Sequence, residues 1–91
     1  MEFEWDVRKA EENFEKHGVR SSEALPVFDD DHAITIADDE SDSGEQRYIS
    51  IGMGLKAWIL VVVYCWREKN IRIISARMAD AHESRQYEEP R

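Results

Sequence analysis

The chain has 91 residues, a formal net charge of −8 and one cysteine, which bounds it to one small domain without an internal disulfide. The acidic excess excludes a protein that binds nucleic acid over its whole surface. The acidic opening Met1–Asp6 lacks the apolar core of a signal peptide, and no apolar run approaches the about 20 residues of a membrane span. We therefore expect a soluble cytoplasmic protein without membrane partners, with Cys65 reduced and buried in the most apolar stretch.

The first residues predict a short strand and a sharply delimited helix. Phe3 and Trp5 alternate with acidic residues, which is the period of a half-buried strand. Asp6 can cap a helix over Val7–His17, because its carboxylate can accept hydrogen bonds from the first-turn N–H groups. Gly18 favours the left-handed backbone conformation in which helices end.

The next segment predicts an irregular second helix and a polar loop. Ser21 or Ser22 can cap the helix, and Pro26 limits it to a turn or two before it ends at Phe28. The loop Asp29–His32 carries three aspartates and a histidine, but consecutive loop positions cannot all converge on one ion. We therefore expect no metal site and no other cofactor.

Two alternating stretches predict strands on either side of an acidic turn. In Ala33–Ala37 the isoleucines Ile34 and Ile36 are expected to face inward. The turn follows over residues 38–44. In the strand that begins at Arg47 and ends near Gly54, the arginine shares a face with Ile49, Ile51 and Met53, and Tyr48 and Ser50 face the other way.

The run Trp58–Trp66 is apolar at odd and at even positions, so it predicts a central strand that is covered on both faces. A four-residue connection, Arg67–Asn70, leads into the last strand, Ile71–Arg77. Strict alternation in that strand separates two sets of side chains: Ile71, Ile73, Ser75 and Arg77 on one face, and Arg72, Ile74 and Ala76 on the other.

The chain ends in a lightly apolar helix. Asp80 and Glu83 have the spacing of a capping box, and the helix extends to Glu89. The order β-α-α-β-β-β-β-α predicts a single α+β domain over residues 1–91, with two layers: a twisted, mainly antiparallel sheet and helices packed on one of its faces.

Charge is distributed unevenly along this order. From Arg47 to Arg77 the chain has six basic residues and one acid, Glu68, so the acidic excess lies entirely outside that stretch. Such a domain can bind a phosphate chain on one face and a basic partner on the other.

Several segments, in order and covering nearly the whole chain, resemble the BrnT toxins: Phe3-Glu4-Trp5-Asp6, Lys16-His17-Gly18-Val19, Glu23-Ala24, Val27-Phe28-Asp29, Glu45-x-Arg47, Ile51-Gly52, Leu60–Tyr64, Ile71–Arg77, Glu83 and Tyr87. The resemblance implies a RelE-like fold and a ribonuclease toxin of a bacterial type II toxin–antitoxin system that cleaves RNA without a metal. It also implies a partner, a BrnA-like ribbon-helix-helix antitoxin. Operator DNA would be bound only indirectly, through that antitoxin.

Metal-free RNA cleavage requires a base for the ribose 2′-OH, cations for the phosphorane and an acid for the leaving 5′-oxygen. Arginine suits the second task because its planar fork binds phosphate oxygens and stays charged. The candidate catalytic residues are His17, Glu45, Arg47, Arg67, Arg72 and Arg77, with Arg77 as first choice. For each arginine the alternative is a surface ion pair with Glu45 or Glu68, and for His17 it is a favourable interaction with the helix C-terminus. Glu45 can act as a base or position Arg47.

Candidate RNA contacts are Lys16, Tyr64, Lys69 and Tyr87, although Tyr64 also fits a core position. Three features depart from the resemblance: Met78 stands where Lys is expected, Asp80–His82 replaces a more basic stretch, and Trp66 occupies a position that is usually polar. Fewer cations weaken attraction to RNA. The alternative function is therefore a weakened or inactive toxin-fold subunit that binds the antitoxin in operon repression.

Overall fold

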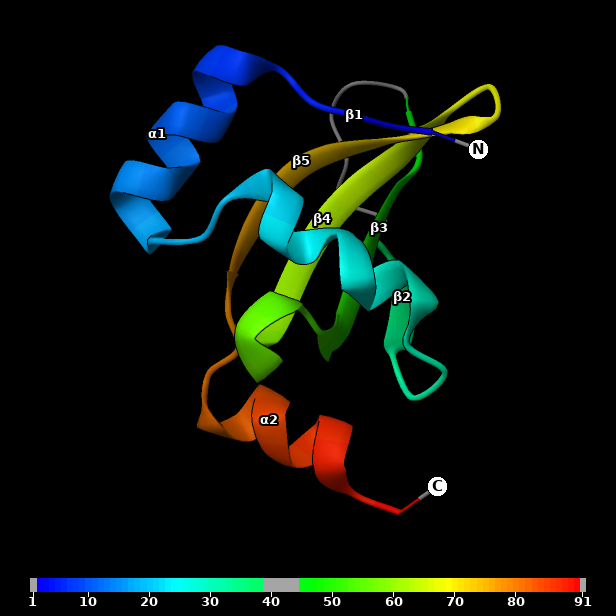
Figure 1. The fold of residues 1–91 in the computed structure, drawn as a ribbon. Coiled ribbons are helices and arrows are strands. Elements are labelled where there is room, and N and C mark those ends of the chain that lie inside the picture. The colour runs from blue at the N-terminus through cyan, green and yellow to red at the C-terminus, as the bar shows by residue number, and fades with distance from the viewer. Residues whose placement is uncertain (1, 39–44, 91) are drawn as a thin grey trace.

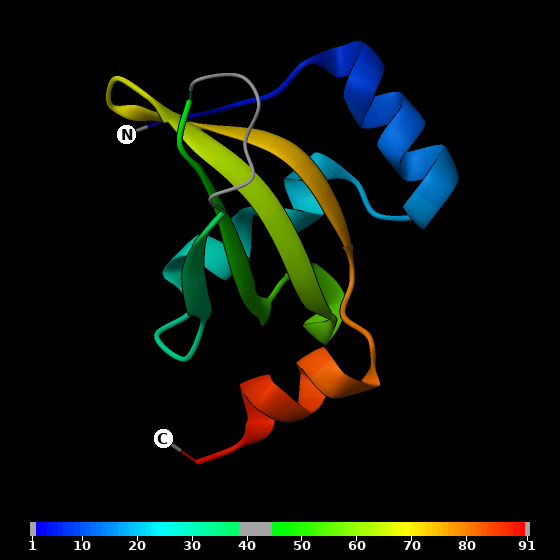
Figure 2. The ribbon, with the colours of Figure 1, turned by 180° about the vertical axis from the view of Figure 1, so that it is seen from behind.

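The computed structural model describes residues 2–38 and 45–90, which build one five-stranded sheet and the helices around it (Figure 1, Figure 2). The elements are, in order, β1 (Phe3–Glu4), α1 (Val7–His17), the 3₁₀ helix η1 (Ser21–Asp29), β2 (Ile34–Asp38), β3 (Arg47–Met53), the 3₁₀ turn η2 (Leu55–Ala57), β4 (Ile59–Arg67), β5 (Asn70–Met78) and α2 (Ala81–Glu88). The predicted α+β class and element order are confirmed. Apart from Asp38, the acidic turn over 38–44 lies outside the described residues.

The strand order in space is β1-β5-β4-β3-β2, so the most apolar strand, β4, is the middle one, as predicted. Among the strands of the described residues, β1 pairs with β5 in parallel and the other pairings are antiparallel. The β4–β5 loop is shorter than predicted, because Arg67 pairs directly with Asn70 and leaves two loop residues. The first of these, Glu68, has a φ of +58°.

The core lies between the sheet and η1, which crosses one face (Figure 1). Ala24 and Val27 of η1 pack with Leu60 and Val62 of β4, and all four side chains are buried. The helix begins at Ser21, and its N-cap is Arg20 rather than the predicted Ser21 or Ser22; the N–H of Arg20 donates to the Glu23 carboxylate at 2.8 Å. It continues past Pro26 to Asp29 in the tighter 3₁₀ form.

Buried Glu23 also receives the ammonium group of Lys56, at 2.7 Å. The hydrogen bond from Lys56, and then that from the N–H of Arg20, lower the pKa of the Glu23 carboxyl. Gly54 fits beside this pair because it lacks a Cβ, which would stand 2.7 Å from the Glu23 carbonyl oxygen. The β3–β4 connection is therefore closely packed on η1.

The other two helices do not lie on the η1 face, in contrast to the predicted single layer. Figure 1 and Figure 2 place α1 beside the outer edge of β5 and α2 beyond the ends of the strands. Asn13 of α1 fills the edge that the short β1 leaves unpaired: its amide donates to the Ala76 carbonyl at 2.8 Å and accepts from the Ala76 N–H at 3.2 Å. A third bond joins Asn13 to the carbonyl of Val19, just beyond the Gly18 C-cap. None of the described helices is long and apolar enough to cross a membrane.

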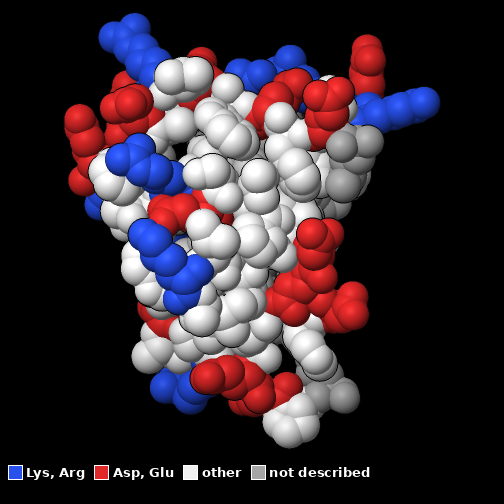
Figure 3. Space-filling view, viewed as in Figure 1, with Lys and Arg blue, Asp and Glu red and all other residues white. Residues whose placement is uncertain are grey.

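The last helix, α2, has no buried residue and is held by polar contacts. Tyr87 donates its hydroxyl proton to Asp30 Oδ2 at 2.6 Å, and the same oxygen accepts from the Met53 N–H at 2.8 Å. Burial would raise the pKa of Asp30, but the bonds from Tyr87, Met53 and His32 lower it below its ordinary value. Acidic side chains border one side of the η1 face, whose centre is mostly uncharged (Figure 3).

No described helix covers the second face of the sheet, which Figure 2 shows toward the viewer. Described helices therefore cover β4 on one face and not on both, contrary to the prediction. Ile36 is also 57% exposed, whereas the sequence predicted that it faces inward. Val61 and Cys65 are nevertheless buried on this face, between cross-strand neighbours with long side chains. We call it the open face.

Candidate active site

A bulge in β5 decides which arginines lie together. Val63 pairs with Ser75, and the next residue of β4, Tyr64, pairs with Ile73, so Ile74 has no partner. The extra residue reverses the alternation, and Arg72 pairs with Cys65 on the open face. The predicted separation of Arg72 from Arg77 is therefore wrong, and both are on the open face.

The strand register then places three arginines around one small residue. Across β3, β4 and β5, Arg47, Cys65 and Arg72 form one row. Arg67 is two residues farther along β4 and thus on the same face, and Glu45 meets it from beyond the start of β3. The small thiol of Cys65 leaves room above it for the arginine side chains.

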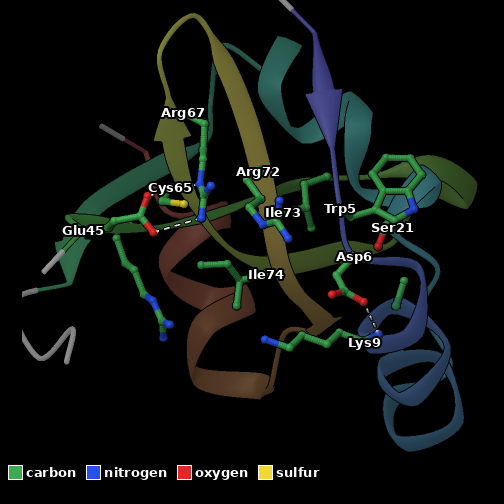
Figure 4. A pocket seen from close by; sticks show the side chains of 12 residues that line it. Trp5, Asp6, Lys9, Ser21, Glu45, Cys65, Arg67, Arg72, Ile73 and Ile74 are labelled. Carbon is green, nitrogen blue, oxygen red and sulfur yellow. Dashed lines mark hydrogen bonds and ion pairs between the residues drawn. The ribbon is translucent and has the colours of Figure 1, made fainter. Parts of the chain in front are cut away.

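These residues line a pocket of about 240 Å³ between the open face and the first turn of α1 (Figure 4). Figure 4 shows Arg67, Arg72 and Lys9 approaching it from β4, β5 and α1. The complete lining is Trp5, Asp6, Lys9, Ala10, Ser21, Glu45, Arg47, Cys65, Arg67, Arg72, Ile73 and Ile74.

Cations outnumber acids in this pocket. Arg67 is paired with Glu45 (Nε to Oε2, 3.2 Å) and Arg72 with Glu4 (Nη1 to Oε1, 3.3 Å). In the part of the chain that the structure describes, the guanidinium of Arg47 and the ammonium of Lys9 form no ion pair. Two of the four cations therefore retain their full hydrogen-bonding capacity for an anion.

Asp6 is the second acid of the pocket and serves as the N-cap of α1. Its carboxylate accepts from the N–H of Lys9 at 3.1 Å, and this bond lowers the pKa of Asp6. The pocket thus stays polar and charged on its α1 side.

The chain is similar to known ribonuclease toxins in sequence and in fold. The family model of BrnT, the ribonuclease toxin of a type II toxin–antitoxin system, matches residues 5–83. This chain belongs to the BrnT toxin family. The crystal structure of the Brucella abortus ribonuclease toxin BrnT has the same fold, with a TM-score of 0.65 at 22% identity over 88% of this chain and 97% of that one. A search of curated proteins finds no match.

Arg77, the first choice among the BrnT candidates, lies outside the pocket. It pairs with Val61, four residues along β4 from Cys65, and is held by Glu83 of α2 through two bonds of 2.8 Å. The bonds from Arg77 lower the pKa of Glu83 to about 2, and Glu83 in turn raises the pKa of Arg77. Arg77 thus anchors α2 in this structure.

The remaining candidates are dispersed. Lys16 and His17 are at the C-terminal end of α1, whereas the pocket is at its N-terminal end. Lys69 is exposed in the β4–β5 loop. Tyr87 docks α2 through its hydroxyl.

Tyr64 is a core residue. It is 6% exposed, packs edge-on against Phe28 and stacks with Tyr48, and its hydroxyl is hydrogen-bonded to Ser50. Its ring has little surface to offer a base, so the expectation that it contacts RNA is not supported.

The structure adds Lys9 to the set. Nothing in its sequence neighbourhood distinguishes it from Arg8 or Lys16, and only the packing of α1 against β5 directs it to the pocket. No group of three or more His, Cys, Asp or Glu residues in the described chain could hold a metal ion.

Proposed function

We propose that this BrnT-family chain is a ribonuclease toxin that cleaves RNA without a metal ion in the pocket around Cys65, and that its antitoxin neutralises it. The observation that carries the proposal is the bulge at Ile74, which adds Arg72 to the face of Arg47 and Arg67. Three guanidinium groups and Lys9 then surround a space that fits a phosphodiester.

The arginine row supplies the positive charge for the reaction. Arg47 and Arg72 are separated by one strand, so their Cα atoms are roughly 10 Å apart. Long side chains from these positions can both reach one phosphate placed over Cys65. In the phosphorane the charge on the equatorial oxygens grows, and cations already fixed on a sheet stabilise it without reorganisation.

We assign the two proton transfers to charged groups beside the arginine row, Glu45 and Lys9. We assign the removal of the ribose 2′-OH proton to Glu45, which lines the pocket; the 2′-oxygen then attacks phosphorus and forms a 2′,3′-cyclic phosphate. The 5′-oxygen leaves with a proton, and we assign its donation to Lys9, which lines the α1 side of the pocket. Arg67 holds the Glu45 carboxylate at the edge of the pocket through their ion pair.

The test is cleavage of a structured RNA by the purified chain, with and without EDTA. Wild type should cleave equally well in both, and Arg72→Ala should reduce the rate by roughly 10²–10³-fold, as removal of one preorganised donor does. Arg85→Ala, which removes an exposed arginine of α2, is the matched control and should leave the rate unchanged. Equal rates for Arg72→Ala and wild type would contradict the assignment of the pocket.

A second variant tests whether Arg77 takes part in RNA cleavage. Its guanidinium is bound to Glu83 and lies two rows from Arg72, so Arg77→Ala should reduce cleavage far less than Arg72→Ala. A folded wild-type chain that cleaves nothing, but still binds its antitoxin, would favour the non-catalytic subunit instead.

A further inference from the structure

The open face carries a grid of apolar side chains next to the arginine pocket. The register aligns Ile36 with Ile49 and Val63, and Ile34 with Ile51 and Val61, and a last pair joins Met53 to Ile59. Apart from buried Val61 these side chains are partly or fully exposed, and Ile36 is 57% exposed at the sheet edge. No described helix covers them (Figure 2).

Contiguous exposed apolar surface of this kind marks an interaction site in a soluble protein. RNA would bind through phosphate contacts and base stacking, and isoleucine and valine offer neither. The grid therefore needs a protein occupant.

Charge defines what that occupant must carry. The row next to the grid holds Arg47 and Arg72, and Arg67 lies one step beyond it on the same face. The guanidinium of Arg47 forms no ion pair within residues 2–38 and 45–90. From Arg67 to Ile59 is eight steps along β4, or roughly 27 Å at about 3.4 Å per residue. A helix of about 18 residues, at 1.5 Å per residue, spans that length.

We propose that the open face is the docking site for an amphipathic, acidic segment of the antitoxin. Its apolar side chains cover the isoleucine and valine rows, and its carboxylates pair with Arg47, Arg67 and Arg72. This inference rests on the proposed function, because it makes the antitoxin occupy the same arginines as RNA. Neutralisation then follows by exclusion of substrate and requires no change in the toxin's shape.

The η1 face differs from the open face in its distribution of charge. On the η1 face, acidic side chains border one side and Lys and Arg side chains lie on the other, around a mostly uncharged centre (Figure 3). That face therefore lacks the row of arginines that an acidic segment would pair with on the open face. Strand β2 allows the two faces to be compared within one element, because adjacent residues point to opposite sides. Ile36 is on the open face and Ala37 is on the η1 face, opposite Tyr48, and both are exposed.

The experiment compares Ile36→Asp with Ala37→Asp, using the protein encoded beside this chain's gene as the antitoxin probe. Neither residue lines the catalytic pocket, so both variants should cleave RNA at the wild-type rate when alone. Ile36→Asp should bind the antitoxin at least about tenfold more weakly and escape inhibition accordingly. Ala37→Asp should be inhibited like wild type.

Ile36→Thr provides a second open-face variant that keeps a β-branched side chain and adds no charge, so a folding defect of the Asp variant does not end the test. Equal inhibition of all variants, or escape by Ala37→Asp alone, would overturn the proposal. Wild type that cleaves no RNA would contradict the proposed function, whereas the binding measurements would still decide the docking face.

Discussion

The two faces of β4 are equally apolar in sequence but are used differently. Leu60 and Val62 point to the covered face and are fully buried under η1. Val63 and Arg67 point to the open face and remain partly or fully exposed. An apolar strand thus supports a core on one side and an uncovered surface on the other, which separates the residues that stabilise the fold from those available to bind.

The largest effect expected from this comparison is on stability. Leu60→Ala should lower the free energy of unfolding by roughly 2–5 kcal/mol, because a fully buried side chain leaves a cavity under η1. Val63→Ala should cost about 1 kcal/mol or less, since the Val63 side chain is already partly exposed. Urea titrations of both variants measure the difference, and equal losses would show that the open face is covered in solution.

The next largest effect on stability is expected at Asn13, which joins α1 to the edge of β5. Asn13→Ala removes three hydrogen bonds, two of them to the β5 edge at Ala76, and leaves part-buried backbone groups without partners. We expect a loss of roughly 1–3 kcal/mol. Asn13→Asp keeps the acceptor for the Ala76 N–H but places a carboxylate against two carbonyl oxygens, so it should recover little. Full stability of Asn13→Asp would contradict this role.

The periodicity of the sequence predicted the elements, because apolar spacing and caps such as Asp6 and Asp80 act locally, and both caps are confirmed. The resemblance added the family. The bulge at Ile74 was missed, although the adjacent pair Ile73-Ile74 interrupts the apolar–polar alternation and is a signal for one.

Two other features could not be predicted from local patterns. The exposure of Ile36 depends on whether a helix packs over that face, and alternation specifies faces without specifying what covers them. Lys9 reaches the pocket, and Asn13 the β5 edge, only because α1 packs beside β5. Such positions follow from tertiary packing.

At the end of the open face, the ion pair between Glu83 and Arg77 predicts a pH effect. The folded pKa of Glu83, about 2, is below its ordinary 4.5, so its contribution to stability is present above pH 4.5 and disappears as the pH falls toward 2. Arg77 is partly exposed, so after allowance for screening we expect about 1 kcal/mol. In Glu83→Gln this part of the acid dependence should be absent from pH-dependent urea titrations. An unchanged pH profile would mean that the pair does not persist in solution.

The smallest effect on stability is expected at the pocket itself, where the effect on function should be large. Glu45 and Arg67 are both substantially exposed, so Glu45→Gln should change the free energy of unfolding by less than about 0.5 kcal/mol. The rate of RNA cleavage should nevertheless fall.

The pH dependence of that rate distinguishes the two roles open to Glu45. If its carboxylate removes the 2′-OH proton, Glu45→Gln should lose the acid limb of the rate profile and recover as hydroxide replaces the base at high pH. If Glu45 only holds Arg67 in place, the loss should be constant with pH, and Arg67→Ala should remove little further activity from the variant. A variant as unstable as Leu60→Ala would instead show that this end of the open face belongs to the structural core.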